Sequence, residues 1–232
     1  MGVCSLAKGT CKMYQPPHHV EDRLEVIHAL IRAHPLGLLV SAGPQGPTAN
    51  ALPFLLDADA GPKGRLRAHM ARANGQWREI AASPDTPVLV IFQGMDTYIT
   101  PSWYATKRET GKVVPTWNYA MVQARGRARV VDDRDWLAAQ IDELTRSHEN
   151  GRKLGEWHVT DAPASYIEAQ IKGIIGLEIE IVELQGKWKV SQNRPAADRA
   201  GVVAGLADEA PEMAELVRRY SDERDAKDRR GT

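Results

Sequence analysis

Short segments in which apolar and polar residues alternate recur along this chain of 232 residues, and they constrain its fold more than any other feature. In RLRAHMA (65–71) every second residue is apolar, as in a β-strand with one buried face. Turns rich in glycine and proline, such as GPQGP (43–47), separate these segments at hairpin spacing. We therefore expect a small antiparallel barrel of about seven strands. Other strands are expected at 36–41, 48–57, 88–94, 116–131 and 176–185, with a turn at Gln185-Gly186 before a last strand at 187–192.

Helices are inserted between these strands, which makes the expected fold class α+β and mainly β. Residues 21–34 place apolar side chains on one helical face, and Pro35 ends the helix. Further helices are expected at 75–82, 132–149 and 163–174. The expected organisation is a disordered leader over 1–12, one domain over 13–206, and a charged helix or tail over 207–232.

Composition excludes several classes of function. The chain has 30 basic and 30 acidic residues, whereas a dedicated nucleic-acid binder usually shows a basic excess. Cys4 and Cys11 are the only cysteines, so neither a disulfide framework nor a cysteine metal site is expected. No apolar run approaches the roughly 18 residues of a membrane span, and a cytoplasmic protein is the expectation. The sequence also lacks the glycine-rich loops of dinucleotide and nucleotide binding, the zinc-protease motif and the serine-hydrolase elbow.

Aromatic side chains concentrate between Gly94 and Gly126, where prolines precede two tryptophans, Trp103 and Trp117. Hydroxyl groups, an amide and cations are interleaved with these rings. Flat rings beside converging polar groups suit a planar, partly anionic ligand. The alternative is a strand pair whose aromatic side chains pack one end of the barrel.

Four motifs, taken together, resemble the PaiB family of FMN-binding negative transcriptional regulators. The first three are MYQPPHH (13–19), HMARANGQW (69–77) and the pair TPSWYATK and VPTWNYA (100–107 and 114–120). The fourth is KWKVSQNR (187–194), and the resemblance extends over residues 13 to 206. It implies a split antiparallel β-barrel with flanking helices, FMN as cofactor, and a homodimer that holds its flavins between the two subunits.

The chain departs from the family pattern at a few positions. His19 stands where the family usually has Phe, and Gly75 where it has Pro. The family pattern VHxYG is replaced by Val122-Gln123-Ala124-Arg125-Gly126. A glutamine amide at 123 can hold a hydrogen bond to flavin, but it can neither transfer a proton nor bind haem iron.

Polar and aromatic residues of these motifs are the candidate cofactor ligands. Arg72 and Asn74, at the start of a helix, are candidates for the flavin phosphate, with a surface cation and a helix cap as the alternative. Lys107 is a second candidate cation. Trp77 and Trp103 suit either flavin stacking or packing of the core or a dimer interface. The full set is His69, Arg72, Asn74, Gln76, Trp77, Ser102, Trp103, Lys107, Thr116, Trp117, Asn118, Gln192 and Asn193; no metal site and no catalytic residue is indicated.

The resemblance implies negative regulation of transcription, and DNA enters as a partner only through it, because no helix-turn-helix is evident. A flavin-dependent oxidoreductase acting on a small molecule is the first alternative. Haem binding or degradation is the second, with four histidines as candidate axial ligands. These are His18, His19, His148 and His158.

Overall fold

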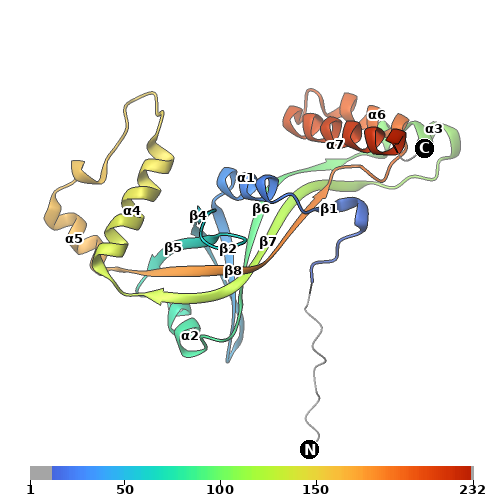
Figure 1. Cartoon of the computed structure of the whole chain (residues 1–232). Coiled ribbons are helices and arrows are strands. Elements are labelled where there is room, and N and C mark those ends of the chain that lie inside the picture. The colour runs from blue at the N-terminus through green and yellow to red at the C-terminus, as the bar shows by residue number, and fades with distance from the viewer. Residues whose placement is uncertain (1–11, 231–232) are drawn as a thin grey trace, which may run out of the picture.

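A computed structural model of the chain describes residues 12–230 and contains an eight-stranded antiparallel sheet surrounded by helices (Figure 1). The strand order is β3-β2-β6-β7-β8-β5-β4, with β1 beside β8. The strands are β1 (Val20–Glu21), β2 (Leu36–Gly43), β3 (Gly46–Pro53), β4 (Leu55–Asp57), β5 (Arg65–Ala71), β6 (Val88–Ile99), β7 (Thr116–Val131) and β8 (Ile174–Lys189). The α-helices are α1 (Leu24–Ala33), α2 (Gln76–Ala82), α3 (Ala105–Thr110), α4 (Arg134–Glu149), α5 (Ala164–Lys172), α6 (Ala196–Leu206) and α7 (Pro211–Arg230).

A bent segment closes the sheet into a barrel. The strand expected over 48–57 is broken at Phe54, so that β3 pairs with β2 and β4 pairs with β5 at the other end of the strand order. Phe54 is buried at the bend, its ring lies edge-on to Phe92 at 5.7 Å, and its amide donates to the Pro35 carbonyl at 2.9 Å. The α+β class, mainly β, with a split antiparallel barrel and flanking helices, is confirmed.

Three long strands, β6, β7 and β8, extend the sheet beyond the barrel. Strand β6 has 12 residues, and β7 and β8 have 16 each. Their far ends lie beside α3, α6 and α7, whereas α2, α4 and α5 lie at the barrel end (Figure 1). Helix α3 and a short 3-10 helix at Pro101–Trp103 interrupt the aromatic segment, which is therefore more than a strand pair. None of the described helices is long and apolar enough to cross a membrane.

The prediction of a turn at Gln185-Gly186 is wrong, because β8 continues through these two residues to Lys189. A Cβ atom on Gly186 would lie 2.8 Å from the Glu21 carbonyl oxygen and 2.9 Å from Ile27 Cγ1. Glycine is thus required here for the close approach of β1 and α1 to β8, rather than for a change of direction. The local pattern of a glycine in a polar context cannot distinguish these two uses.

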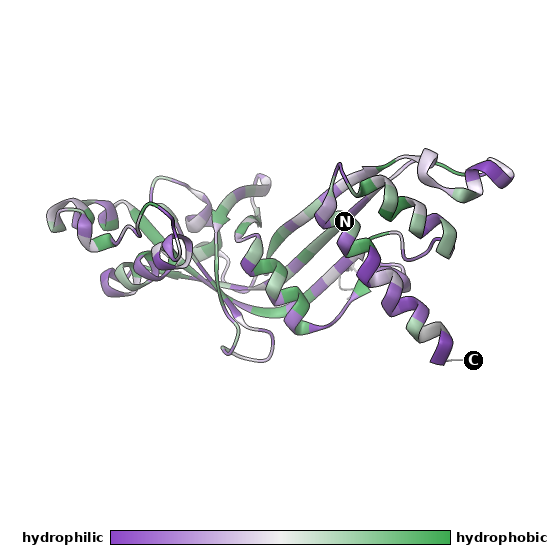
Figure 2. Ribbon diagram, turned by 90° about the horizontal axis from the view of Figure 1, so that it is seen from above, coloured by the Kyte–Doolittle hydropathy of each residue, from purple (hydrophilic) through white to green (hydrophobic). Residues whose placement is uncertain are grey.

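The charged C-terminal segment forms the helix α7, and its first half belongs to the core. Met213, Val217 and Tyr220 are buried, whereas the second half is hydrophilic (Figure 2). The Tyr220 hydroxyl donates to the buried Glu21 carboxylate, which also pairs with Arg23 at 2.5 Å. These contacts connect α7 to the start of the domain. The expected leader, apart from Lys12, and both cysteines lie outside the described residues.

Candidate functional site

The candidate ligands predicted from the sequence fall into two groups at opposite ends of the sheet. His69 pairs with Gly176 near the start of β8, whereas Tyr119, close to the second group, pairs with Lys189 at its end. The intervening strand of about 13 residues corresponds to about 43 Å of chain at ~3.3 Å per residue. One subunit therefore does not bring the two groups together. The barrel-end group contains His69, Arg72, Asn74, Gln76 and Trp77, and the remaining eight candidates form the second group.

Arg72 is held by an ion pair in the barrel-end group. Its guanidinium donates to both carboxylate oxygens of Asp132, at 2.6 and 2.8 Å, and to the Lys172 carbonyl at 3.2 Å. The guanidinium lowers the pKa of the Asp132 carboxyl below its usual value. Nearby, a ring nitrogen of His69 lies 2.7 Å from Oε1 of the buried Gln140. Both side chains thus have partners within the chain.

Gln76 is buried and connects α2 to the hairpin of β2 and β3. Its Nε2 group lies within 3.2 Å of three acceptors, the carbonyls of Leu39 and Thr48 and the hydroxyl of Ser41. Its Oε1 atom accepts from Asn50 Nδ2 at 2.9 Å. The carboxamide therefore has internal partners for its donors and its acceptor, which is the arrangement expected of a structural amide.

The other two members of the barrel-end group are also bound within the chain. The Asn74 side chain accepts from the Gln76 amide at 3.0 Å. The Trp77 indole donates to the Arg72 carbonyl at 3.0 Å, and the Arg78 guanidinium lies 4.5 Å from the centroid of its ring. The Arg78 guanidinium therefore already occupies one face of the Trp77 ring.

In the second group, Ser102, Trp103 and Lys107 stabilise the turn that leads into α3. Lys107 Nζ donates to Ser102 Oγ at 3.1 Å. The Trp103 ring lies against α6, where a Cβ atom on Gly205 would overlap it. This tryptophan therefore serves helix packing, one of the two roles expected of it.

Asn118 is buried at the outer end of β7. Its amide donates to the Ser191 hydroxyl at 3.0 Å, and that hydroxyl lies 3.2 Å from Asn118 Oδ1. Ser191 has a φ of 67°, a left-handed conformation that is uncommon for residues other than glycine. The Asn118 amide thus supports the turn that ends the last strand.

Gln192 follows in this turn and is also buried. Its Oε1 atom accepts from the Val190 amide at 2.8 Å and lies 3.1 Å from His19 Nδ1, while its Nε2 atom donates to the Trp188 carbonyl at 2.6 Å. Burial, followed by the nearby His18, lowers the pKa of His19 to about 4, so this ring is neutral at pH 7. Asn193, in contrast, is exposed.

Aromatic rings and lysines meet on the outer face of the sheet, by which we mean the side of β2, β3, β6, β7 and β8 turned away from the core. Trp117 is 53% exposed and lies edge-on to Tyr98, with ring centroids 6.0 Å apart. Lys189 donates to Thr116 Oγ1 at 2.5 Å and to the Trp117 carbonyl. Lys187 lies beside it on β8.

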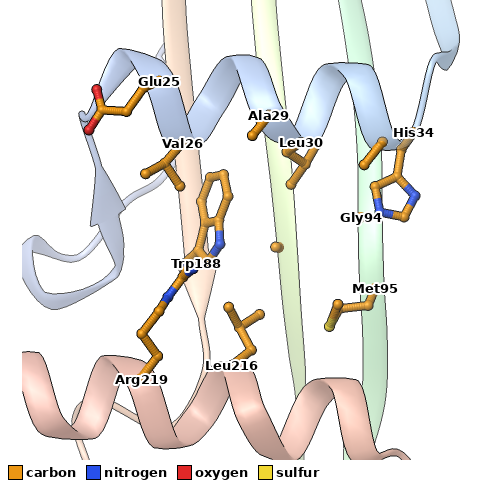
Figure 3. A pocket seen from close by; sticks show the side chains of 12 residues that line it. Glu25, Val26, Ala29, Leu30, His34, Gly94, Met95, Trp188, Leu216 and Arg219 are labelled. Atoms are coloured by element: carbon orange, nitrogen blue, oxygen red, sulfur yellow. The ribbon is translucent and has the colours of Figure 1, made fainter. Parts of the chain in front are cut away.

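Sequence reasoning missed the two lysines, although they stand in the quoted motif KWKVSQNR. The available signal was the alternation of the strand: Trp188 and Val190 point into the core, which places Lys187 and Lys189 on the opposite face. Trp188 lines a hollow of about 410 Å³ between α1 and α7, on the inner side of the sheet (Figure 3). None of the predicted ligands lines this hollow.

The half of the outer face formed by β2, β3 and the start of β6 is mainly apolar. Leu36 and Leu38 on β2 are 64% and 39% exposed, and Leu38 lies opposite Ala51 on β3 and Ile91 on β6. Gln123 on β7, where the family has histidine, lies opposite Ile91 of β6. The apolar members of this face are Leu36, Leu38, Val40, Ala49, Ala51, Leu89, Ile91 and Met121.

The aromatic end of the outer face fits a planar anionic cofactor better than the barrel-end group does within one subunit. It offers the exposed indole of Trp117 and, beside it, the Tyr119 ring and the ammonium groups of Lys187 and Lys189. In the barrel-end group the guanidinium and the buried amide already have partners. No group of three or more histidine, cysteine or acidic side chains suited to a metal occurs in the part of the chain that the structure describes.

Comparison with known proteins decides the family. A family model described as "Putative FMN-binding domain" matches residues 13–183. The protease synthase and sporulation protein PAI 2 of Bacillus subtilis is 32% identical over 209 residues, covering 88% of this chain and 96% of the relative. The chain belongs to the PaiB family of FMN-binding proteins. The resemblance expected from the four motifs, and FMN as the cofactor of the domain, are thereby confirmed.

One further relative is similar to this chain in sequence, and one solved structure is similar to it in fold. The uncharacterized protein AN0679 of Emericella nidulans is 37% identical over 251 residues, covering 93% of this chain and all of the relative. The conserved hypothetical protein Rv2991 of Mycobacterium tuberculosis shares the fold, with a TM-score of 0.53 and 14% identity over 79% of this chain and 94% of that one.

Proposed function

We propose that this PaiB-family chain works as a homodimer in which each FMN lies between the aromatic end of one subunit and the barrel end of the other. The observation that carries the proposal is the separation of the two groups of candidate ligands along β8. A two-fold axis through the middle of the outer face would place the barrel end of each subunit beside the aromatic end of its partner. Two equivalent clefts result.

The apolar half of the outer face supports this arrangement. Large exposed side chains such as Leu36 and Leu38, together with Ile91, form a contiguous apolar patch on a regular sheet. Such patches mark interfaces in soluble proteins. An interface with two-fold symmetry is self-complementary, and an apolar sheet face meets that requirement without a second kind of surface.

When bound, FMN would supply the transfer of electrons, and the residues of this chain would hold and orient it. Trp117 and Tyr119 offer ring faces for the isoalloxazine, and Thr116 and Gln123 offer polar groups for its edge. Of the barrel-end candidates, His69, Arg72, Asn74 and Trp77 remain proposed contacts of the partner's flavin, reached across the interface. We assign no catalytic acid, base or nucleophile in either group.

The proposed biological role is negative regulation of transcription by the flavin-loaded dimer in the cytoplasm, and it rests on the resemblance. Two of the three arginines of β7 are already paired with glutamates, because Arg129 pairs with Glu178 at 2.5 Å and Arg125 lies 3.7 Å from Glu183. A flavin-dependent oxidoreductase is the alternative. Bleaching of bound flavin by NADH or NADPH, with recovery in air, would favour the oxidoreductase.

The test combines flavin retention with molecular mass. Purified protein is incubated with FMN, desalted, and examined by absorbance near 370 and 450 nm and by light scattering. We expect about one flavin per subunit in a dimer, and we expect Leu38→Glu to lose both the dimer and the flavin, because it buries a charge in the interface. Tyr166→Glu, on exposed α5, is the matched control and should keep both. Full flavin retention by a monomeric Leu38→Glu protein would contradict the two-subunit site.

A further inference from the structure

The hollow between α1 and α7, about 410 Å³ in volume, is lined mainly by small and apolar residues. Ala29 on α1, Gly94 on β6 and Ala120 on β7 leave the space open, and Leu216 faces it from α7 (Figure 3). Sites for small molecules in proteins have volumes of roughly 300–1,000 Å³ and combine an apolar lining with a few polar groups that fix the ligand. The hollow has the size and the apolar lining of such a site.

Trp188 presents an unused hydrogen-bond donor to this hollow. The residue is only 3% exposed, and the nitrogen-bearing edge of its ring faces the hollow (Figure 3). Its indole Nε1 donates to no acceptor among the described residues. By contrast, the indoles of Trp77 and Trp136 donate to oxygens within the chain, at 3.0 and 2.8 Å. Because a buried indole N–H usually has an acceptor, the Trp188 donor points to a ligand that carries an oxygen.

Arg219 brings a positive charge to the same hollow. Its side chain extends from α7 toward α1 (Figure 3), and its guanidinium lies 5.2 Å from the centroid of the Tyr220 ring. No carboxylate of the described residues pairs with it, whereas its neighbour Arg218 pairs with Glu215. Glu25 also lines the hollow, but its carboxylate points away from it (Figure 3). A guanidinium and an indole N–H can only donate, so together they favour an anionic oxygen acceptor.

We propose that this hollow binds a small aromatic or aliphatic carboxylic acid. Its hydrocarbon part lies against Ala29, Met95 and Leu216, and its carboxylate accepts from Trp188 Nε1 and from Arg219. Burial of the hydrocarbon supplies affinity, and the two donors supply selectivity for an acid. The hollow lies on the inner side of the sheet, opposite the outer face that holds the proposed flavin clefts, so this site does not rest on the proposed function.

Isothermal titration calorimetry of the full chain with two probes tests the selectivity. The probes are 3-phenylpropanoate and the uncharged 3-phenylpropanol, which has the same carbon skeleton. We expect saturable binding of the acid, about 10- to 100-fold tighter than that of the alcohol, as a charge-assisted hydrogen bond provides. Arg219→Gln should lower the affinity for the acid to that for the alcohol. Arg218→Gln, which changes the neighbouring arginine outside the hollow, is the control and should keep the preference.

Filling the hollow tests its location. Ala29 is exposed on α1, so Ala29→Phe adds a ring to the hollow without disturbing the core. We expect this variant to bind both probes at least about tenfold more weakly, because its ring occupies their space. Ala169→Phe, at an exposed position of α5, is the matched control and should bind both as wild type does. Thermal unfolding shows that both variants are folded.

Several results would overturn the proposal. Equal affinity of wild type for the acid and the alcohol would remove the carboxylate, and undiminished binding by Ala29→Phe would place the probes elsewhere. No saturable binding of the acid would leave the hollow a gap in packing or, if Ala29→Phe also lowers the molecular mass in light scattering, a contact between copies. Displacement of the acid by FMN would place the flavin in the hollow and contradict the proposed function as well. Unchanged acid binding in saturating FMN supports a separate site.

Discussion

His19 is a buried imidazole, 4% exposed, in a region that already contains two lysines. Its ring lies 3.1 Å from Gln192, and its folded-state pKa is about 4 against an ordinary value of 6.5. Between these two values the unfolded chain binds a proton that the folded chain does not. The imidazole therefore contributes no penalty above pH 6.5, and folding is increasingly penalised as the pH falls toward 4.

We accordingly expect the free energy of unfolding to decrease between pH 6.5 and about 4 more steeply in wild type than in His19→Phe. Phenylalanine places an aromatic ring at the same buried position without a titratable group, and the comparison with wild type cancels the carboxylates that both proteins share. Urea unfolding at a series of pH values measures the difference. Parallel profiles for the two proteins would mean that His19 is protonated with its ordinary pKa in the folded state.

Gly186 shows how an element depends on a single contact. Strand β8 passes so close to β1 and α1 that a Cβ atom on Gly186 would lie 2.8 Å from a backbone oxygen. We expect Gly186→Ala to destabilise the protein by about 1–3 kcal/mol, the usual cost of overpacking. Gly75→Ala is the control, because nothing lies within 4 Å of its Cβ position. Thermal unfolding measures both, and equal stability of the two variants would contradict the close approach.

Elements with a clear period could be predicted from the sequence. The alternation in 65–71 and the helical stripe in 21–34 correspond to β5 and α1, and Thr116–Val131 is β7 with the expected bounds. The break at Phe54 and the uninterrupted β8 were missed, because both follow from contacts with distant segments that a local pattern does not contain. The same holds for the order of the strands, which places β8 between β7 and β5.

The candidate site was predictable only in part for the same reason. Motif residues such as Gln76 and Asn118 stand out as polar groups beside apolar strands. Their partners, Ser41 and Ser191, lie 35 and 73 residues away in the sequence. Composition cannot show whether such an amide is satisfied within the chain or awaits a ligand. Lys187 and Lys189 were overlooked because lysine on a strand usually faces solvent, and only the fold reveals that both lack acidic partners.

At the scale of the whole molecule, the proposed site shared by two subunits would link flavin binding to dimerisation. If FMN contacts both chains, it binds the dimer more tightly than the monomer, and by thermodynamic reciprocity it must tighten the dimer by the same factor. We expect FMN to lower the dimer dissociation constant at least about tenfold, which corresponds to ~1.4 kcal/mol of coupling. Riboflavin should lower it less if the phosphate contributes to that coupling.

Sedimentation velocity over a range of protein concentrations, with and without saturating FMN, measures this coupling. A Lys153→Met protein, changed at an exposed loop lysine, serves as a control that should show the wild-type shift. A dissociation constant that does not change with FMN, in a protein that demonstrably binds it, would place the flavin within one subunit. The two groups of candidate ligands would then not belong to one site, because about 43 Å of β8 separates them, and the barrel-end group would be purely structural.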